Sequence, residues 1–304
     1  MITVFTPSYN RADLLPRLYD SLCVQTFSDF EWVIVDDGST DNTQEVVNKI
    51  ILNHKKSNPN FPIRYYYKVN GGKHTAINLG VNKACGDLFF IADSDDYLPS
   101  NALKLVIEQW NEVKNDDFFG GVCGLDLLKG KKEVVGGMPP YDILDCTFLE
   151  YWWKFKMKNG DMKEVYRTSV LREFPFPEIP GEKFCPEELV WARIAQKYKL
   201  RYFSKVIYIA DYQEHGISAN MTRMRMQSPL LSMMMYAENV SYDILPFSRK
   251  VRYAINYWRF RACFHRSSLN ALIKLPVLRW YWVWTAPLGF VLHVRDSYMK
   301  KIRV

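Results

Sequence analysis

The sequence predicts an α/β fold in which a mixed, mostly parallel sheet is flanked by helices and followed by a basic, aromatic, helical region. Over residues 1–100, short apolar runs alternate with stretches of helical periodicity, which favours a parallel sheet with helices on its faces. Polar clusters follow three of the four expected strands. Ligands of such Rossmann-like sheets bind beyond the carboxyl ends of the strands. These clusters are therefore expected to converge on one site.

Each expected element has its own signal in the sequence. Strands are predicted where short runs of β-favouring residues end in polar turns, and helices where apolar residues recur every three or four positions. The expected strands are Ile2–Thr6, Glu31–Val35, Ile63–Val69, Leu88–Ala92 and Tyr202–Ala210. The expected helices are Leu14–Val24, Thr43–Leu52, Ala76–Ala84 and Glu187–Tyr198.

Composition and charge set broad limits on the class of protein. The chain of 304 residues is 48% hydrophobic and 24% charged, as expected of a globular protein. Its six cysteines show no metal-type spacing, and they are expected to be reduced. No basic segment followed by an apolar stretch opens the chain, so no secretory signal is predicted and a cytoplasmic location is expected.

An acidic cluster, Asp93-Ser94-Asp95-Asp96, follows the apolar run LFFIA. Three carboxylates this close repel each other, and a hard divalent cation such as Mg²⁺ or Mn²⁺ compensates that repulsion with oxygen ligands. The alternative is a solvated acidic turn that precedes a helix. The cluster alone does not decide between a metal site and such a turn.

Two further clusters carry polar chemistry. Asp36 and Asp37 follow the run EWVIV, where they either form an ordinary Asp-Gly-Ser turn or accept hydrogen bonds from a base or a ribose. Gly71, Gly72 and Lys73 precede a predicted helix. Glycines let the backbone approach a ligand, and a helix N-terminus attracts phosphate. Neither the ATP-binding loop nor the dinucleotide-binding loop pattern is present.

Together these motifs resemble the family 2 glycosyltransferases. The matching segments are TPSYNRADLLPRLYDSLCVQTFSDFEWVIVDDGSTDNT, NGGKHTAINLGVNKACGDLFFIADSDDYL and EELVWARIA. The resemblance covers residues 1 to about 218 and implies a GT-A fold, a nucleotide-sugar donor and transfer with inversion. It also implies that the nucleoside pocket is lined by Thr6, Pro7 and Asn10.

The resemblance assigns roles to the acidic clusters as well. It implies that Asp37 binds the base and that Asp36 supports its loop. Asp93 and Asp95 match the family's DxD motif, with Asp93 toward the ribose and the metal, and Asp95 on the metal. The remaining positions expected at the donor and the metal are Ser94 and Lys73 for the donor and Asp96 as a second metal ligand.

Inverting members of the family use an acidic base, commonly an Asp of a Glu-Asp pair at the start of a helix. Here Glu187 and Glu188 match that pair. Counting back from Arg193 favours Glu187, although both remain candidates. Glutamates in a first helical turn also stabilise the helix dipole without any catalytic duty. A role for His215 at the metal or diphosphate is a further, weaker expectation.

The chain's end is basic and aromatic. Residues 221–304 hold 14 Lys and Arg against 3 Asp and Glu. The longest uncharged stretch there has 15 residues, fewer than the about 20 that a membrane span needs. Aromatic side chains beside Arg suit the headgroup region of an anionic membrane. The alternative is a helical subdomain packed on the catalytic domain, and no nucleic-acid partner is expected.

The sequence thus predicts a catalytic domain at residues 1–220 and a helical, membrane-associating region at residues 221–304. The expected function is metal-dependent transfer of a sugar, from a UDP-sugar in particular, to a glycan or lipid-linked acceptor at the inner face of the membrane. Two other functions remain open at this point. One is nucleotidyl transfer on a similar sheet, and the other is binding without catalysis.

Overall fold

The computed structural model describes residues 1–56, 61–131, 133–157, 161–211, 217–264 and 277–302. It divides into two compact units. The first comprises Met1–Phe176 and Arg193–Glu214, and the second comprises Pro177–Ala192 and His215–Val304. Within the described ranges, no helix carries an apolar stretch of the length that a bilayer crossing requires.

The first unit is built on one sheet of eight strands in the order β3-β2-β1-β4-β7-β5-β8-β6. The first four strands in this order run parallel, whereas β7 and β6 are antiparallel to their neighbours. The predicted mixed, mostly parallel sheet is confirmed. The strands are β1 Ile2–Ser8, β2 Phe30–Asp36, β3 Ile63–Tyr67, β4 Leu88–Ile91, β5 Phe119–Leu128, β6 Ile143–Cys146, β7 Met162–Arg167 and β8 Lys199–Ala210.

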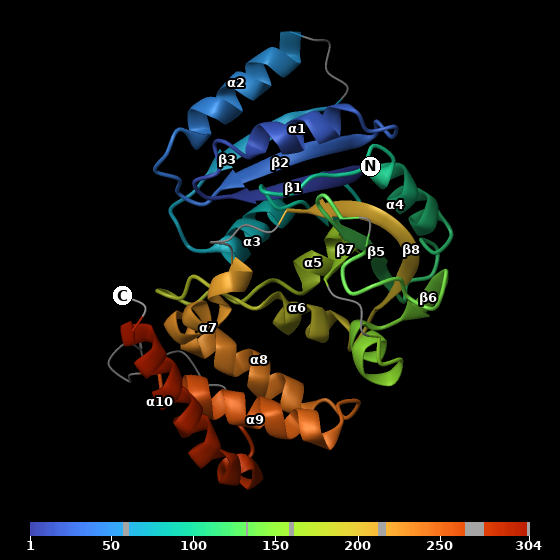
Figure 1. Cartoon of the computed structure of the whole chain (residues 1–304). Helices are drawn as coiled ribbons and strands as arrows, with labels where there is room; N and C mark the ends of the chain where they lie inside the picture. The colour runs from blue at the N-terminus through green and yellow to red at the C-terminus, as the bar shows by residue number, and fades with distance from the viewer. Residues whose placement is uncertain (57–60, 132, 158–160, 212–216, 265–276, 303–304) are drawn as a thin grey trace. The chain divides into compact units, whose positions relative to one another are not determined.

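Successive side chains of each strand point to opposite faces of the sheet, and both faces are buried. Ile2 and Val4 of β1 belong to the same apolar cluster as Trp32 of β2 and the helices α1, α2 and α4. Phe5 points the other way, since its ring lies against Gly80 of α3. Figure 1 shows α3 on the opposite side of the sheet from α1 and α2. Both faces are covered, which explains why β1 and β2 are buried along their whole length. The helices of this unit are α1 Leu15–Cys23, α2 Thr43–Lys56, α3 Lys73–Lys83, α4 Ala102–Asn111 and α5 Thr168–Glu173, with a short π-helical turn η1 at Glu150–Lys154.

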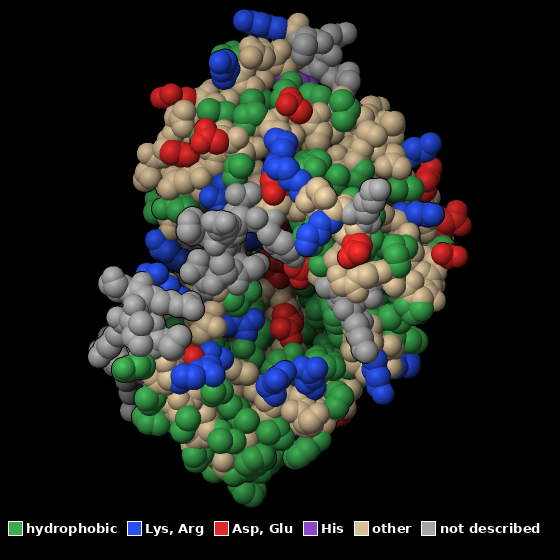
Figure 2. Space-filling model, viewed as in Figure 1, with side chains coloured by type: hydrophobic (Ala, Val, Ile, Leu, Met, Phe, Trp, Pro, Cys, Tyr) green, Lys and Arg blue, Asp and Glu red, His purple; other side chains and the backbone are tan. Residues whose placement is uncertain are grey.

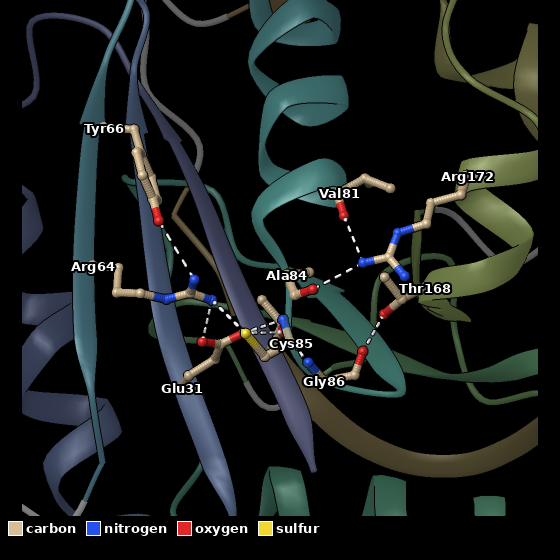
Figure 3. A network of polar contacts seen from close by, with 10 residues as sticks. Glu31, Arg64, Tyr66, Val81, Ala84, Cys85, Gly86, Thr168 and Arg172 are labelled. Carbon is tan, nitrogen blue, oxygen red and sulfur yellow. Dashed lines mark hydrogen bonds and ion pairs between the residues drawn. The ribbon is translucent and has the colours of Figure 1, made fainter.

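Helix α3 approaches the sheet closely because it carries a glycine at the contact. A Cβ at Gly80 would lie 2.2 Å from the ring of Phe5. The C-terminal end of α3 is held by Arg172, whose guanidinium donates to the carbonyls of Val81 and Ala84 at 3.3 and 2.9 Å. Figure 3 shows Arg172 reaching this helix end. The opposite end of α3, which begins at Lys73, is thereby fixed at the carboxyl edge of the sheet.

The buried carboxylate of Glu31 links three strands at the amino edge of the sheet, near the end of α3. Glu31 Oε1 accepts hydrogen bonds from the hydroxyl of Thr3 at 2.6 Å and from the backbone N–H of Cys85 at 2.7 Å. The guanidinium of Arg64, on the adjacent strand, pairs with the other oxygen of Glu31 (Figure 3). The network ties β1, β2 and β3 to the chain that leaves α3.

The second unit is helical. Its carboxylate Glu182 accepts the backbone N–H groups of Leu230 and Leu231 at 2.7 and 2.8 Å, at the start of α8. This contact explains why residues 177–192 group with the C-terminal helices, although the sequence division placed them in the first domain. The elements are α6 Glu187–Ile194 (shared with the first unit), α7 Ile217–Gln227, α8 Pro229–Ser241, α9 Phe247–Arg261, η3 Trp280–Thr285 and α10 Ala286–Ile302.

Candidate active site

The acidic turn after β4 presents its carboxylates in two directions. Asp93 and Asp95 are partly exposed, whereas Ser94 and Asp96 are buried. The turn lies at the carboxyl edge of the sheet, where β1 and β2 also end. The exposed pair is therefore placed to meet a ligand, and the buried Asp96 is placed to hold the turn.

Cationic side chains surround Asp93. Lys73 Nζ, in the first turn of α3, lies 2.6 Å from Asp93 Oδ1, and each side chain is 28% exposed. Burial alone would raise the pKa of Asp93, but the positive charges of Lys73 and Lys163 outweigh it and hold that pKa below its usual value. Arg11, three residues after the end of β1, contributes in the same direction. Asp93 is therefore ionised at neutral pH.

The other two carboxyls of the turn behave differently. Burial raises the pKa of Asp95, and the negative charge of Asp93 raises it further. Burial, with the charge of Asp93, raises the pKa of Asp96 to about 6. A bound cation would relieve this repulsion, so the turn favours one.

Tyr208 of β8 contacts the acidic turn through its hydroxyl group. Its buried hydroxyl accepts the backbone N–H of Asp93 at 2.7 Å and contacts the carboxylate of Asp96. The ring of Tyr208 is covered by Lys163 of β7, whose Nζ lies 3.6 Å from the ring centroid. Burial would lower the pKa of Lys163, but Asp93, Asp126 and Asp96 outweigh it and raise that pKa. A permanent positive charge thus lies beneath the acidic turn.

Asp211, directly after β8, also stabilises the acidic turn. Its backbone N–H donates to Asp96 Oδ1 at 2.8 Å. Its carboxylate pairs with Arg17 at 2.5 Å and with Lys129 at 2.7 Å. Arg17 also donates to the carbonyl of Asp95. The two partners of Asp96, Tyr208 and Asp211, are placed by one strand, so the geometry of the turn depends on β8.

Asp37 is buried and holds the glycine loop before α3. One carboxylate oxygen accepts Lys68 Nζ at 2.8 Å and the N–H of Gly71 at 2.9 Å. The other accepts the N–H of Gly72 at 2.7 Å and the amide of Asn70 at 3.3 Å. These contacts use the acceptor positions of the carboxylate. The base contact expected of Asp37 is not tested by them and stays a prediction.

The remaining residues expected at the nucleoside differ in exposure. Asp36 is buried and accepts the N–H of Ser39 and the hydroxyl of Tyr65 at 2.7 and 2.8 Å, which agrees with a role in supporting its loop. Thr6 and Pro7 are also buried. Asn10 is partly exposed and has a positive φ of 53°. Its side-chain oxygen accepts the N–H of Thr40 at 2.8 Å, which ties it to the loop after β2.

The two glutamates at the start of α6 are not equivalent. Glu188 Oε1 accepts the hydroxyl of Tyr253 at 2.8 Å and the amide of Asn239 at 3.2 Å. Burial raises the pKa of Glu188, and the bond from Tyr253 opposes part of that rise. Glu188 thus ties α6 to α8 and α9 within the second unit. Glu187 precedes it in the sequence, and both side chains are partly exposed.

The carboxylates of the acidic turn suit a divalent cation that prefers oxygen ligands, such as Mg²⁺ or Mn²⁺. No group of three or more His, Cys, Asp or Glu side chains that could hold a metal ion by itself occurs in the described parts of the chain. Two carboxylates, Asp93 and Asp95, are nevertheless sufficient for Mg²⁺ or Mn²⁺ when substrate phosphates and water complete the shell. His215 lies outside the described residues.

Several residues at the site were not predicted from the sequence. They are Arg11, Arg17, Lys163, Tyr208 and Asp211. Arg11 lies three residues beyond β1 and Asp211 directly follows β8, so the rule that ligands lie beyond strand ends could have found them. Lys163 lies within β7 and carries no such signal.

Comparison with known proteins identifies the family. The model of the family described as Glycosyl transferase family 2 matches residues 3–134. An uncharacterized glycosyltransferase of Nostoc sp. is 32% identical over 233 residues, which are 73% of this chain and 67% of that relative. The chain belongs to glycosyl transferase family 2. A chondroitin synthase and a hyaluronan synthase of Pasteurella multocida are each 40% identical to this family 2 chain over 114 residues, which are 38% of the chain and only 11% of either synthase.

Solved structures share the fold of this family 2 protein. Staphylococcus aureus TarS in complex with UDP matches with a TM-score of 0.61 at 20% identity, over 99% of this chain and 91% of that one. The mannosyltransferase PcManGT from Pyrobaculum calidifontis, in complex with GDP-Man and Mn²⁺, matches with a TM-score of 0.55 at 16% identity, over 98% and 75%. At these identities the likeness shows the fold. The predicted GT-A type sheet with a helical C-terminal extension is confirmed.

Proposed function

We propose that this protein transfers a sugar from a UDP-sugar to a glycan or lipid-linked acceptor in the synthesis of a cell-surface polysaccharide. The observation that carries the proposal is the partly exposed pair Asp93 and Asp95 beside Lys73 at the start of α3. Acidic groups for a cation and a basic group for a diphosphate thus lie within one edge of the sheet. The names of the Pasteurella synthases support polysaccharide synthesis, and the TarS complexes with UDP and UDP-GlcNAc support a uridine donor.

The donor would be held at its diphosphate. Asp93 and Asp95, with Asp96 as a further candidate, would hold Mn²⁺ or Mg²⁺, which when bound supplies positive charge opposite the departing nucleoside diphosphate. Lys73 donates to phosphate oxygens from the first turn of α3, where the helix dipole also favours an anion. Arg11, whose charge already reaches Asp93 and Asp95, adds a second cationic group.

The acceptor would be activated by Glu187. Its carboxylate takes the proton of the acceptor hydroxyl as that oxygen bonds to the anomeric carbon of the sugar. The bond between the anomeric carbon and the diphosphate oxygen breaks, and its electron pair leaves with the nucleoside diphosphate. Attack opposite the leaving group inverts the anomeric centre. We assign this role to Glu187 because counting back from Arg193 matches it to the position of the family's base. Glu188, whose Oε1 accepts hydrogen bonds from Tyr253 and Asn239, is the alternative.

Paired substitutions test the reaction and the base together. Glu187→Gln is expected to lower turnover by about 10²–10⁴-fold, whereas Glu188→Gln keeps the side-chain oxygen that accepts from Tyr253 and is expected to retain most activity. Turnover is measured as release of UDP from candidate UDP-sugars with Mn²⁺, with the exposed Asp20→Asn as a control. Equal losses at both glutamates would overturn the choice of base.

The same assay separates the other two functions. Asp95→Ala is expected to abolish transfer while the melting temperature is kept. Release of pyrophosphate from a nucleoside triphosphate would instead indicate nucleotidyl transfer. A thermal-shift screen of UDP-sugars with and without Mn²⁺ detects donor binding independently, because a ligand stabilises the folded state by mass action. Donor binding without UDP release from any sugar would favour a non-catalytic role.

The proposal also locates the enzyme at the inner face of the cell membrane. The excess of Lys and Arg in residues 221–304 supports contact with anionic headgroups. The helices of the second unit carry this charge, including Arg252 and Arg261 of α9. Such a location would bring the enzyme to lipid-linked acceptors.

A further inference from the structure

The last two helical elements of the second unit expose large apolar side chains along one side. Trp280 is 84% exposed and Val291 is 63% exposed. Figure 2 shows hydrophobic side chains gathered at the lower end of this unit. We call the following set the apolar stripe: Trp280, Tyr281, Val283, Trp284, Leu288, Phe290, Val291, Val294 and Tyr298.

The opposite side of α10 is the one that packs within the unit. A Cβ at Gly289 would lie 2.5 Å from the side chain of Trp258. Asp296 pairs with Arg259 at 2.5 Å, also on α9. The stripe positions Leu288, Val291, Val294 and Tyr298 recur every three or four residues, so they share the side of the helix turned away from these contacts. An ordinary solvent-facing side would be polar here.

We infer that the apolar stripe is a membrane-insertion face that enters the headgroup region of an anionic bilayer. The inference rests on the proposed membrane location and adds how the contact is made. Trp and Tyr prefer the boundary between headgroups and acyl chains, and aliphatic side chains beside them bury apolar area there. Insertion, more than attraction between charges, would then supply the binding free energy.

The charges around the stripe favour an anionic surface as its partner. Arg279 precedes the apolar stripe, Arg295 lies within its length four residues after Val291, and both are exposed. Asp296 is the one carboxylate in residues 277–298, and it is held by Arg259 and Arg295 at 2.5 and 2.9 Å. Headgroups with negative charge therefore meet arginines and no free acid. A second copy of the same stripe would instead bring arginines of like charge together.

Vesicle flotation of the full chain tests the inference. We expect the wild-type protein to float with vesicles of phosphatidylglycerol and phosphatidylcholine, and to remain bound in part at high salt, because apolar insertion is not screened. The double variant Trp284→Glu/Val291→Glu is expected to lose about tenfold or more in partition. Phe118→Glu is the matched control, since Phe118 is 70% exposed in the first unit, and it is expected to float like wild type.

Further outcomes decide against the inference. Binding that salt abolishes, and that the double variant leaves unchanged, would show a purely electrostatic contact. A shift from dimer to monomer in the double variant, without vesicle binding by the wild type, would show an interface between copies. UDP release from a UDP-sugar in detergent-free solution tests the chemistry separately, and the double variant is expected to keep it, so loss of flotation with normal release would not bear on the proposed reaction.

Discussion

The hydroxyl of Tyr208 accepts the backbone N–H of Asp93 at 2.7 Å. This bond joins the strand β8 to the first residue of the acidic turn, and the same hydroxyl contacts Asp96. Both residues belong to the first unit, so the support is internal to the sheet domain. The candidate metal ligands are thus positioned by a side chain far along the chain from them.

Tyr208→Phe is expected to weaken Mn²⁺ binding about tenfold and to cost about 1–2 kcal/mol of stability, because a buried N–H and a carboxylate lose their partner. Tyr202→Phe is the control. Tyr202 is buried in the same strand, and its hydroxyl has no hydrogen-bond partner among the described residues. Mn²⁺ titration followed by electron paramagnetic resonance, with denaturant unfolding, measures both effects. Equal behaviour of the two variants would contradict a positioning role for Tyr208.

Lys73→Gln is expected to weaken UDP binding by about 10- to 100-fold, since one charge-assisted hydrogen bond contributes about 1.5–3 kcal/mol. The effect should shrink as salt is raised, because the side chain is partly exposed. Lys83→Gln, at the other end of α3, serves as the control and should bind UDP normally. Calorimetric titration with UDP gives both affinities. A salt-independent loss would point to a packing role instead.

The pKa of Asp96 predicts how stability changes with pH. Its value of about 6 in the folded protein exceeds the ordinary 3.8, so the folded state holds this proton more tightly than the unfolded state. Raising the pH from about 4 to about 6 removes the proton and destabilises the fold, by up to about 3 kcal/mol at 1.36 kcal/mol per unit. Asp96→Asn should remove this part of the pH dependence. Urea unfolding of both proteins, with chelator present, measures the difference between them.

Gly80→Ala is expected to cost about 1–3 kcal/mol, because the added methyl group meets the ring of Phe5 at 2.2 Å. In a Phe5→Leu background the same substitution should cost less, since the smaller side chain leaves room for the methyl group. A double-mutant cycle in urea gives the coupling between the two positions. An additive result would show that α3 moves away without strain.

The parallel half of the sheet could be predicted because its strands are apolar runs that end in polar turns. β1, β2 and β4 lie where the sequence indicates, within a few residues. In the other half, the strand predicted at Tyr202–Ala210 is β8, Lys199–Ala210. β5 and β7 could not be predicted, because β5 contains three glycines and a buried aspartate, and β7 reads MKEVYR. Such strands lack the apolar alternation that marks a half-buried strand. Their pairing is set by the neighbouring strands, which the local sequence does not encode.

The candidate site also contains residues that the sequence predicted and residues that it did not. The acidic turn and Lys73 could be predicted because strand ends and helix starts are visible in the sequence. Lys163 could not be predicted, because the role of this partly buried lysine is recognised only when Asp93, Asp126 and Asp96 are seen around it. The hydrogen bond between Glu188 and Tyr253 could not be predicted either, because the two residues are 65 positions apart in the sequence.

The four hydrogen bonds accepted by the carboxylate of Asp37 join the end of β2 to the loop before α3. A substitution at Asp37, made to change the predicted base contact, would therefore also release the loop that precedes Lys73, where the diphosphate is predicted to bind. Asn10 is partly exposed two residues beyond β1, and its side-chain oxygen accepts the N–H of Thr40, so a substitution there would act on a different loop.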